Sequence, residues 1–409
     1  MNILKKKTIL LAVASLASLP AFSQQLDCEK SYGFRADVNG TKGQTLCASN
    51  VDAFIDSAKN FTMSNVKYTQ TSAAMGQGRF NDLNVALSYA AGSNTLNYSF
   101  PELGMSGSFT GRNRDESEEQ FVDFLKKTDI LGKVLHYQAQ HSASSALTGA
   151  GGLIPMLGMT DFATGFDTAS KVIASGGQSG NVNNLIGIGL GYSSYNVSGG
   201  GEKVTTTSLP LSYTFRSSDD ARRQVVLSMP IMQARTGDAN AYNFGLGLAV
   251  RLPVTDHWTL TPGVRYSAVA SVDRATVSTV ASGSLMSTYV IPMGAVDLAV
   301  GNMIALYKTG KFRSGDYSFD PDIQLKMTRN GLMLSTPVAA LGSSMAAEFS
   351  LIDTRYLGEK PFVSNSQEIG ATIGTNRNAA NAHSFMRAGL SYVRSNVTKG
   401  FTVNFGYWF

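Results

Sequence analysis

The sequence predicts a mainly β protein, with a twelve-stranded antiparallel transmembrane β-barrel at the C-terminus and a small α+β domain before it. Three observations lead to this fold class. Apolar residues alternate with small or polar ones from Leu185 to the end of the chain, and a period of two is typical of strands. The last segment, Lys399 to Phe409, carries a row of large apolar residues on one face and ends on an aromatic residue. No stretch after the first 23 residues approaches the roughly 18 continuous apolar residues of a membrane-spanning helix, so a membrane protein of this sequence has to be a closed barrel.

The composition agrees with this fold class. Hydrophobic residues make up 43% of the chain and charged residues only 15%, which is little charge for a soluble protein. The 41 glycines suit strands that alternate between a large and a small face. The formal net charge of +5 is modest, and no basic stripe interleaved with aromatic residues appears, so we expect no nucleic-acid partner.

Residues 1–23 have the features of a secretory signal peptide. Lys5, Lys6 and Lys7 give a basic start, an apolar stretch runs from Ile9 to Leu19, and small residues flank Phe22. This pattern predicts cleavage and export, with a mature chain that begins near Gln24.

Residues 24–142 are predicted to form the small α+β domain. Short alternating runs at 83–89, 95–100 and 105–110 predict strands, since turn residues separate them. A helix is expected from Asp115, because acidic residues begin it and an apolar stripe follows. The stripe contains Phe121, Phe124, Leu125, Ile130, Leu131, Val134 and Leu135. Packing on the sheet of its own domain is the ordinary role of such a stripe, and a partner-binding helix is the alternative.

Both cysteines, Cys28 and Cys47, lie in this domain. In an oxidising compartment we expect a disulfide that closes a loop of about 20 residues and contributes on the order of 3 kcal/mol; free or catalytic thiols are the alternatives. Two cysteines without a nearby histidine make a poor metal site, so no metal and no other cofactor is expected.

Residues 143–183 are rich in glycine and serine and are predicted to hold a short helix at 160–175. Two interpretations stay open for this segment. It either threads or plugs the barrel, or it is a disordered connector in the periplasm.

Residues 184–409 are predicted to form the barrel. An even number of strands is typical of single-chain bacterial barrels. The twelve predicted strands are 185–196, 203–216, 222–235, 240–252, 257–271, 278–291, 294–308, 320–338, 344–356, 366–375, 384–395 and 399–409. If Phe409 is periplasmic, counting back places several longer loops outside, as expected, but the long connector 375–383 falls on the periplasmic side without an explanation.

Alternation also predicts which side chains face lipid. Ile186 to Tyr192 and Phe244 to Val250 should point their large residues outward and their glycines inward. The alternation slips near Asn330-Gly331, where a β-bulge would keep the apolar residues on both sides of the slip toward lipid. Pro210 and Pro230 each remove a ladder donor, so local bulges or imperfect pairing are expected there.

The predicted inward-facing set contains charges of both signs: Arg216, Arg251, Arg265, Lys326, Arg387, Asp297, Glu348 and Glu368. A water-filled pore lined in this way would weakly favour anions. Alternatively, these charges pair across the lumen or hold a plug.

Enzymatic activity is not expected. A barrel hydrolase needs serine, histidine and an orienting residue together on one face, whereas His383 and Ser384 are adjacent and would point to opposite faces of a strand. The Gly-x-Gly-x-Gly pattern at Gly187 to Gly191 belongs to a strand and not to a phosphate-binding loop.

The chain ends N-F-G-Y-W-F, and this ending, the strand pattern and the preceding segment together resemble an autotransporter-type translocator barrel or a related secretion channel. The resemblance implies that Phe405, Tyr407, Trp408 and Phe409 form an insertion signal for the barrel-assembly machinery. It also implies the outer membrane of a Gram-negative bacterium, with outer-membrane lipid around the barrel and a secreted client or small solute as cargo. Unlike a typical autotransporter, the chain has no long repetitive passenger. We therefore expect either a porin-like channel or translocator, with residues 24–142 in the periplasm or outside, or a barrel that anchors a surface adhesin or binding module.

Overall fold

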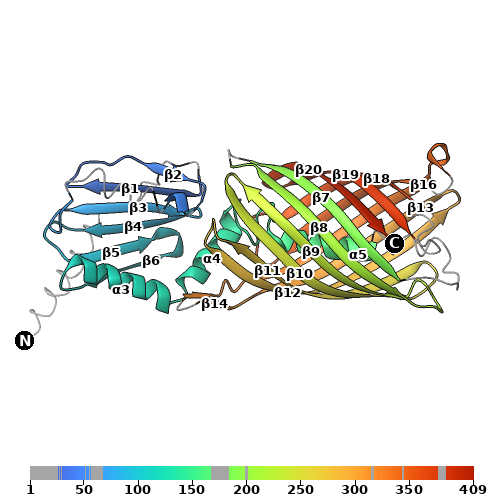
Figure 1. Ribbon diagram of the computed structural model, residues 1–409, viewed down its shortest axis with the longest axis horizontal. Coiled ribbons are helices and arrows are strands. Elements are labelled where there is room, and N and C mark those ends of the chain that lie inside the picture. The colour runs from blue at the N-terminus through green and yellow to red at the C-terminus, as the bar shows by residue number, and fades with distance from the viewer. Residues whose placement is uncertain are drawn as a thin grey trace, which may run out of the picture.

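The structure is a computed structural model. It describes residues 26, 28, 30–50, 52–54, 56, 68–166, 184–198, 201–314, 317–342, 345–375 and 384–409. The predicted signal peptide, residues 167–175 of the predicted plug helix, and most of the 375–383 connector lie outside the described residues. Two bodies are evident in Figure 1, a small sheet domain that contains the N-terminal part of the chain and a long barrel.

The N-terminal domain is built on one antiparallel sheet with the strand order β2-β1-β3-β4-β5-β6. The strands are β1 (Tyr32–Val38), β2 (Leu46–Ala48), β3 (Ala74–Phe80), β4 (Leu83–Tyr89), β5 (Thr95–Phe100) and β6 (Met105–Thr110), with a short 3₁₀ turn, η1 (Pro101–Leu103), before β6. The three strands predicted at 83–89, 95–100 and 105–110 are therefore present with the same bounds.

Two helices follow this sheet where the sequence suggested one. They are α3 (Arg114–Lys127) and α4 (Ile130–His141), and the chain leaves the helical conformation between them because Thr128 is extended. The apolar stripe packs on the sheet of its own domain, as expected: Phe121, Ile130 and Val134 are buried in one cluster with sheet residues. The side chain of Asn113 caps α3 by accepting a hydrogen bond from the backbone N–H of Glu116.

A buried arginine ties α3 to the turns of the sheet. Arg114 is fully buried, and its guanidinium donates to the carbonyls of Ser93 (2.9 Å), Ser72 (2.6 Å) and Ala90 (3.2 Å) while it lies 4.4 Å from the centre of the Tyr89 ring. Because buried carbonyls need donors, this one side chain satisfies several turns at once.

The C-terminal part is a closed antiparallel barrel of twelve strands in which β20 pairs with β7. The strands are β7 (Leu185–Val197), β8 (Val204–Arg216), β9 (Gln224–Thr236), β10 (Ala239–Pro253), β11 (Trp258–Ser271), β12 (Thr276–Met293), β13 (Val296–Gly310), β16 (Gln324–Pro337), β17 (Ala346–Leu357), β18 (Asn365–Gly374), β19 (Phe385–Ser395) and β20 (Thr398–Trp408). A hairpin of β14 (Phe312–Ser314) and β15 (Tyr317–Phe319) lies in the loop after β13, and a 3₁₀ turn, η2 (Ala339–Leu341), follows β16. The predicted fold class and strand number are confirmed.

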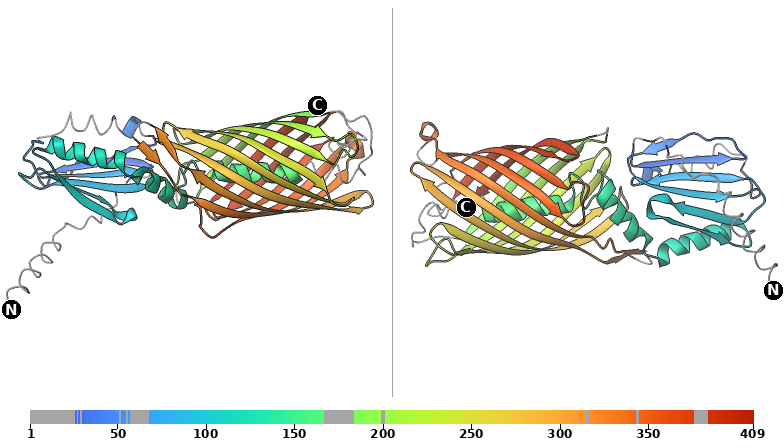
Figure 2. Two further views of the ribbon diagram at one scale, coloured as in Figure 1. Left: turned by 90° about the horizontal axis from the view of Figure 1, so that it is seen from below. Right: turned by 180° about the vertical axis from the view of Figure 1, so that it is seen from behind.

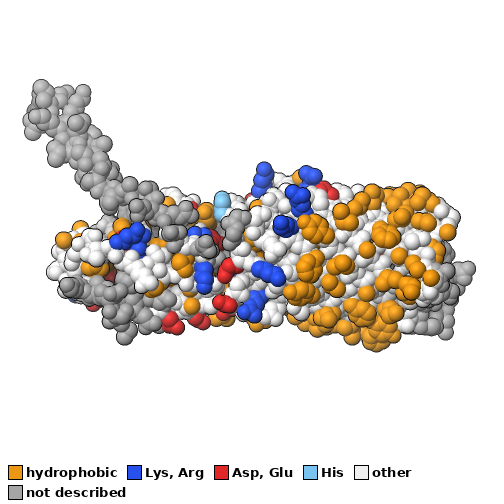
Figure 3. Space-filling view, turned by 90° about the horizontal axis from the view of Figure 1, so that it is seen from above, with side chains coloured by type: hydrophobic (Ala, Val, Ile, Leu, Met, Phe, Trp, Pro, Cys, Tyr) orange, Lys and Arg blue, Asp and Glu red, His pale blue; other side chains and the backbone are white. Residues whose placement is uncertain are grey.

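The exterior of the barrel is hydrophobic. Leu190 and Leu246 are both 57% exposed, whereas Gly187, Gly189, Gly245 and Gly247 on the opposite face are buried. Figure 3 shows a broad band of hydrophobic side chains over one face of the barrel. None of the described helices has the length and hydropathy needed to cross a bilayer.

Two details of the strand prediction need correction. The bulge predicted at Asn330-Gly331 is absent, because β16 keeps one continuous register with β13 and with β17. The two prolines face each other, with Pro210 opposite Pro230 in the β8–β9 ladder. No bulge forms, but the ladders on their other sides skip the positions beside Pro210 and Pro230, so the imperfect pairing expected there is present.

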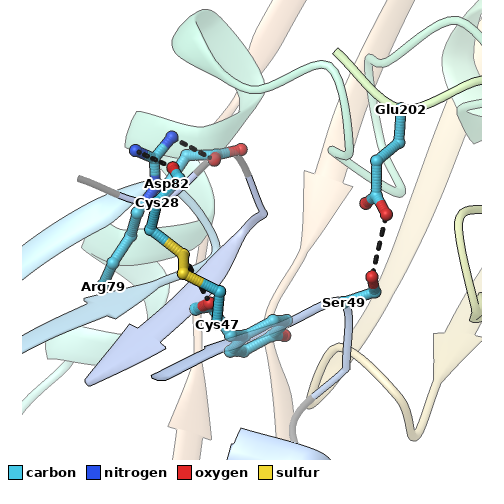
Figure 4. Close-up of a disulfide and its surroundings, with 7 residues drawn as sticks. Cys28, Cys47, Ser49, Arg79, Asp82 and Glu202 are labelled. Carbon is cyan, nitrogen blue, oxygen red and sulfur yellow. Dashed lines mark hydrogen bonds and ion pairs between the residues drawn. A yellow bond between two sulfur atoms is a disulfide. The ribbon is translucent and has the colours of Figure 1, made fainter. Parts of the chain in front are cut away.

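The N-terminal domain sits at one end of the barrel, and the C-terminus lies toward the other end (Figures 1 and 2). Ser49 donates to Glu202 in the β7–β8 loop (2.8 Å), as Figure 4 shows beside the Cys28–Cys47 disulfide. Asn81 donates to the carbonyl of Arg274 in the β11–β12 loop (2.9 Å). The domain therefore rests on the loops at this end of the barrel, which we call the domain end.

Candidate functional site

A helix occupies the lumen of the barrel. α5 (Leu153–Phe166) lies inside the strand wall in both views of Figure 2 and contacts β10, β11, β12, β13 and β16. A helix of this length extends about 20 Å, which is most of the roughly 25 Å apolar band of an outer-membrane barrel. The segment predicted as a linker or plug is therefore a plug, although its helix begins earlier than the predicted Thr160.

Most side chains of α5 are apolar, and so are many inward-facing residues of the wall that it contacts. Leu153, Ile154, Leu157 and Phe166 are fully buried. They belong to one cluster with inward-facing wall residues, which include Met232, Val269, Val280, Met286, Val290, Met303, Leu325, Met327 and Met333. A largely hydrophobic helix is stable only where it is enclosed, so the lumen around these side chains is a protein core and not a water-filled pore.

Two paired glycines in the wall make room for the aromatic side chains of the plug. Gly301 and Gly331 are direct partners in the β13–β16 ladder. A Cβ atom at Gly301 would lie 2.5 Å from Phe166, and one at Gly331 would lie 2.8 Å from Phe162. The two phenylalanine rings contact each other at a centroid distance of 4.9 Å. These glycines are needed for close approach of the helix to the wall, which explains the position that sequence reasoning assigned to a bulge.

One buried ion pair joins the plug to the wall. The Nη2 and Nε atoms of Arg265 donate to Oδ1 of Asp161 at 2.7 and 2.9 Å, and both side chains are less than a tenth exposed. Removing one partner of such a pair is costly because the other charge stays buried. Asp161 and Arg265 therefore form a polar latch between α5 and β11.

Two backbone carbonyls of α5 also accept hydrogen bonds from the wall. Arg251 Nε donates to the carbonyl of Thr164 (3.1 Å), and Arg251 also bonds to Gln224. Thr288 Oγ1 donates to the carbonyl of Gly165 (3.0 Å). A cation on β10 and a hydroxyl on β12 thus bind two carbonyls of the described part of α5 and anchor the helix to the wall.

Other inward charges pair within the wall. Arg387 bonds to Glu348 at 2.8 Å, and Arg329 bonds to Glu368 at 2.8 Å while its guanidinium lies 5.2 Å from the centre of the Phe162 ring. Arg216 and Asp297 are buried on the inner face as well. Of the two readings of these charges, the arrangement fits pairing and plug holding, not an open anion-selective pore.

The prediction that Lys326 faces the lumen is wrong. Lys326 is exposed on the outer face, while Leu325 and Met327 point inward and pack against the plug. The error arose because apolar residues were assumed to face lipid, whereas here the lumen is apolar too. The inward charge on this strand is Arg329, which the sequence prediction missed; its signal was the uninterrupted alternation with Met327 and Met333.

One small cavity lies beside α5. The cavity between α5 and the wall near Met159, Tyr195, Tyr356, Glu368 and Val393 has a volume of about 40 Å³. A single water needs roughly 10–15 Å³, so this cavity holds a few waters and no ordinary solute.

Helices α3 and α4 of the N-terminal domain cover the domain end of the barrel. The β14–β15 hairpin packs against α3 and α4, the backbone N–H of Asp320 donates to Asp129 (3.2 Å), and His136 bonds to the carbonyl of Pro321 (2.7 Å). The backbone N–H of Phe362 donates to the carbonyl of Ala139 (2.8 Å). The end of α4 and the barrel loops thus form one contact surface from which α5 descends.

The aromatic residues at the C-terminus divide between two faces. Phe405, Tyr407 and Phe409 are 48%, 41% and 41% exposed on the lipid-facing side. Trp408 turns the other way and stacks on Phe385 with a centroid distance of 4.8 Å. Three of the four predicted signal residues are therefore accessible from the membrane side.

No family model matches the chain, and no curated protein sequence matches it. Among solved structures, the β-domain of the Bordetella autotransporter BrkA is similar at 13% identity and a TM-score of 0.43, with 55% of this chain and 98% of that chain covered. The translocator domain of the autotransporter NalP from Neisseria meningitidis is similar at 14% identity and a TM-score of 0.43, with 63% and 95% covered. An outer membrane channel from Pseudomonas putida F1 is similar at 13% identity and a TM-score of 0.38, with 56% and 96% covered. At these TM-scores the matches carry no functional argument.

Proposed function

We propose that this protein is a bacterial outer-membrane translocator of the autotransporter kind, which displays its own N-terminal domain at the cell surface and then stays closed by its plug helix. The observation that carries the proposal is the path of the chain. The domain rests on one end of the barrel, α5 passes down the lumen, and β7 begins at the opposite end, where the backbone N–H of Ile186 donates to the carbonyl of Phe409 (2.8 Å).

If the N-terminal domain is exported through the lumen, the segment that joins it to β7 remains inside the barrel, which is the path seen here. A chain that begins its first strand at the end of the barrel holding the C-terminus has to cross the lumen to reach a domain at the other end. In bacterial barrels the last strand is inserted with its aromatic end at an interface, and the longer loops lie outside. With the C-terminus in the periplasm, the domain end faces the medium.

The plug argues against a general porin that passes small solutes and favours a translocator. Moving α5 out would expose Leu153, Leu157 and Phe166 to water, and burial of each such side chain contributes about 1.5–3 kcal/mol. It would also separate the buried Asp161–Arg265 pair. We therefore assign the N-terminal domain, not a diffusing solute, as the cargo.

The experiment uses one specific protease site at two places in the full chain. One variant carries the site in the turn at Gly92, which has open space around it; the matched control carries it in the turn at Asp256, at the other end of the barrel, whose side chain is 88% exposed. Protease added to intact cells is expected to cut the Gly92 variant alone, and permeabilised cells should allow both cuts. Cutting of the Asp256 variant alone in intact cells would contradict the proposal.

One observation favours a binding role for the displayed domain. Among the described residues, β6 pairs with β5 alone, and its exposed residues Ser106, Gly107 and Ser108 carry no charge. Natural proteins usually protect such an edge with charges or prolines, and an open edge accepts an added strand from a partner. Ser108→Pro should abolish surface binding to a partner that adds a strand, and an unchanged bound fraction on whole cells would exclude this mode.

A further inference from the structure

Positive side chains gather on the outer face of the barrel just beyond its hydrophobic band. Figure 3 shows lysine and arginine side chains between the band and the N-terminal domain. On the six adjacent strands from β13 to β20, five exposed cations lie near the domain end: Lys308 on β13, Lys326 on β16, Arg355 on β17, Arg394 on β19 and Lys399 on β20. All five are exposed, and each lies on the outer face of its strand, together with the exposed apolar residues of that face. We call this group the basic collar.

The strand register places these cations side by side. Lys326 is opposite Leu306, two residues from Lys308, and also opposite Leu357, two residues from Arg355. Such diagonal neighbours lie about 7–8 Å apart. The collar spans six adjacent strands, from β13 to β20, or about 24 Å at interstrand spacings near 4.8 Å.

The pairing of Arg394 with Lys399 points to an anion outside the protein. The two residues are direct partners in the β19–β20 ladder, and like charges directly opposite each other destabilise a sheet. In the described part of the chain, neither side chain forms an ion pair, and the same holds for Lys308 and Lys326; Arg355 alone has a carboxylate, Asp353, at 2.9 Å. A ligand with negative charge would offset this repulsion.

The position of the collar identifies the class of ligand. The next outward pair below Arg394 and Lys399 is Tyr392 and Phe401, which are 49% and 47% exposed. Aromatic residues mark the level of the lipid headgroups in membrane barrels. A ligand that contacts the collar therefore has acyl chains against the band and negative groups about one residue pair above the aromatics.

The opposite rim has no comparable group on its described residues. Its outward strand ends are apolar, for example Phe215, Leu252 and Met293, and Arg222 in its β8–β9 turn pairs with Asp220 (2.8 Å) and Asp256 (3.2 Å). The asymmetry means that the collar serves the leaflet at the domain end alone.

We propose that the basic collar binds the phosphates of a phosphorylated glycolipid in the leaflet around the domain end. The proposal rests on the outward orientation of that end under the proposed function, since this orientation selects a glycolipid over a phospholipid. Lysine and arginine suit this role because both hold phosphate by charge-assisted hydrogen bonds, and cations near a membrane surface bind anionic headgroups.

The test titrates the purified full-length protein, in detergent, with lipid A carrying two phosphates and with its dephosphorylated form, and counts bound lipid by native mass spectrometry. We expect the phosphorylated lipid to bind and the dephosphorylated form not to bind. The variant Arg394→Gln with Lys399→Gln should bind about 25-fold more weakly, at about fivefold per charge. The control Arg223→Gln, in the turn at the other end, should bind like the native protein. A heat-dependent gel shift checks that each barrel is folded.

Equal binding of the dephosphorylated lipid, an unchanged affinity of the double variant, or equal affinity for phosphatidylglycerol would each overturn the proposal. Lipid binding in detergent does not depend on which side of the membrane the domain end faces, so the titration tests the collar separately from the proposed function. A periplasmic domain would leave lipid binding intact while contradicting the proposed function, and a loss of lipid binding would leave the protease result unchanged.

Discussion

Replacing Asp161 by alanine should open the barrel, because it leaves the guanidinium of Arg265 buried without its carboxylate. The side chains of Arg265 and Asp161 are 3% and 9% exposed and joined by two hydrogen bonds. Breaking a buried pair of this kind costs about 3–5 kcal/mol. At 1.4 kcal/mol per factor of ten, the equilibrium between the plugged and open states shifts toward open by roughly two to four orders of magnitude.

The measurement is single-channel recording of the full-length protein in planar bilayers. The native protein should stay closed at low voltage, and Asp161→Ala should show frequent openings. The double variant Asp161→Leu with Arg265→Met should be closed again, because apolar replacement of a whole buried pair is close to neutral. The matched control is Asp353→Asn, which removes an exposed carboxylate paired with Arg355 on the outer face and should leave the recording unchanged.

This cycle has a clear negative result. If Asp161→Ala is as closed as the native protein, the latch does not hold the plug. If the double variant opens as often as Asp161→Ala, the openings come from lost packing and not from an unpaired charge.

Gly331→Leu should raise the single-channel conductance, because the leucine side chain takes the place of Phe162, and adding Phe162→Ala should restore closure. The control Gly283→Ala, at a site with no atom within 4 Å of the new Cβ, should leave the conductance unchanged. A Gly331→Leu variant with the conductance of the native protein would contradict the close fit. Arg114→Met should destabilise the N-terminal domain by about 3 kcal/mol or more, since several buried carbonyls lose their donor. The measurement is proteolysis of this domain in a protein whose barrel still shows the heat-dependent gel shift of a folded barrel. Full protease resistance of the variant domain would count against this role of Arg114. Reducing the disulfide should lower the stability of the same domain by about 3 kcal/mol, measured by the same proteolysis with and without reductant, and identical digestion rates would refute the expectation.

The strands of the barrel were predictable from sequence because each has lipid on one flank. Leu246 and Phe244 alternate with Gly245 and Gly247, and this contrast needs no knowledge of the rest of the fold. The same alternation placed Arg251 and Arg265 inside, where the structure also has them. Their partners, a carbonyl and a carboxylate of α5, were not predictable, because pairing across the lumen depends on how a separate segment is seated.

The start of the plug helix was predicted too late in the sequence, at Thr160. Gly149 to Gly152 suggested a flexible segment that would continue to Thr160, although Pro155 in the first turn of α5 is a recognised helix-start signal. The orientation of Lys326 failed because a row of apolar residues indicates an apolar environment, not which side of the wall that environment is on. Leu153, Leu157 and Phe162 of the plug give this part of the lumen an apolar lining partner, so inward residues of β16 are apolar as well.

We conclude that α5 lies in the lumen of the mature protein in its membrane. A photo-cross-linking amino acid at Met159, which lines the small cavity beside the helix, tests this directly in living cells. We expect intramolecular adducts to the cavity wall, in peptides that contain Tyr195, Tyr356 or Val393. Adducts to other proteins, or to the N-terminal domain alone, would contradict it.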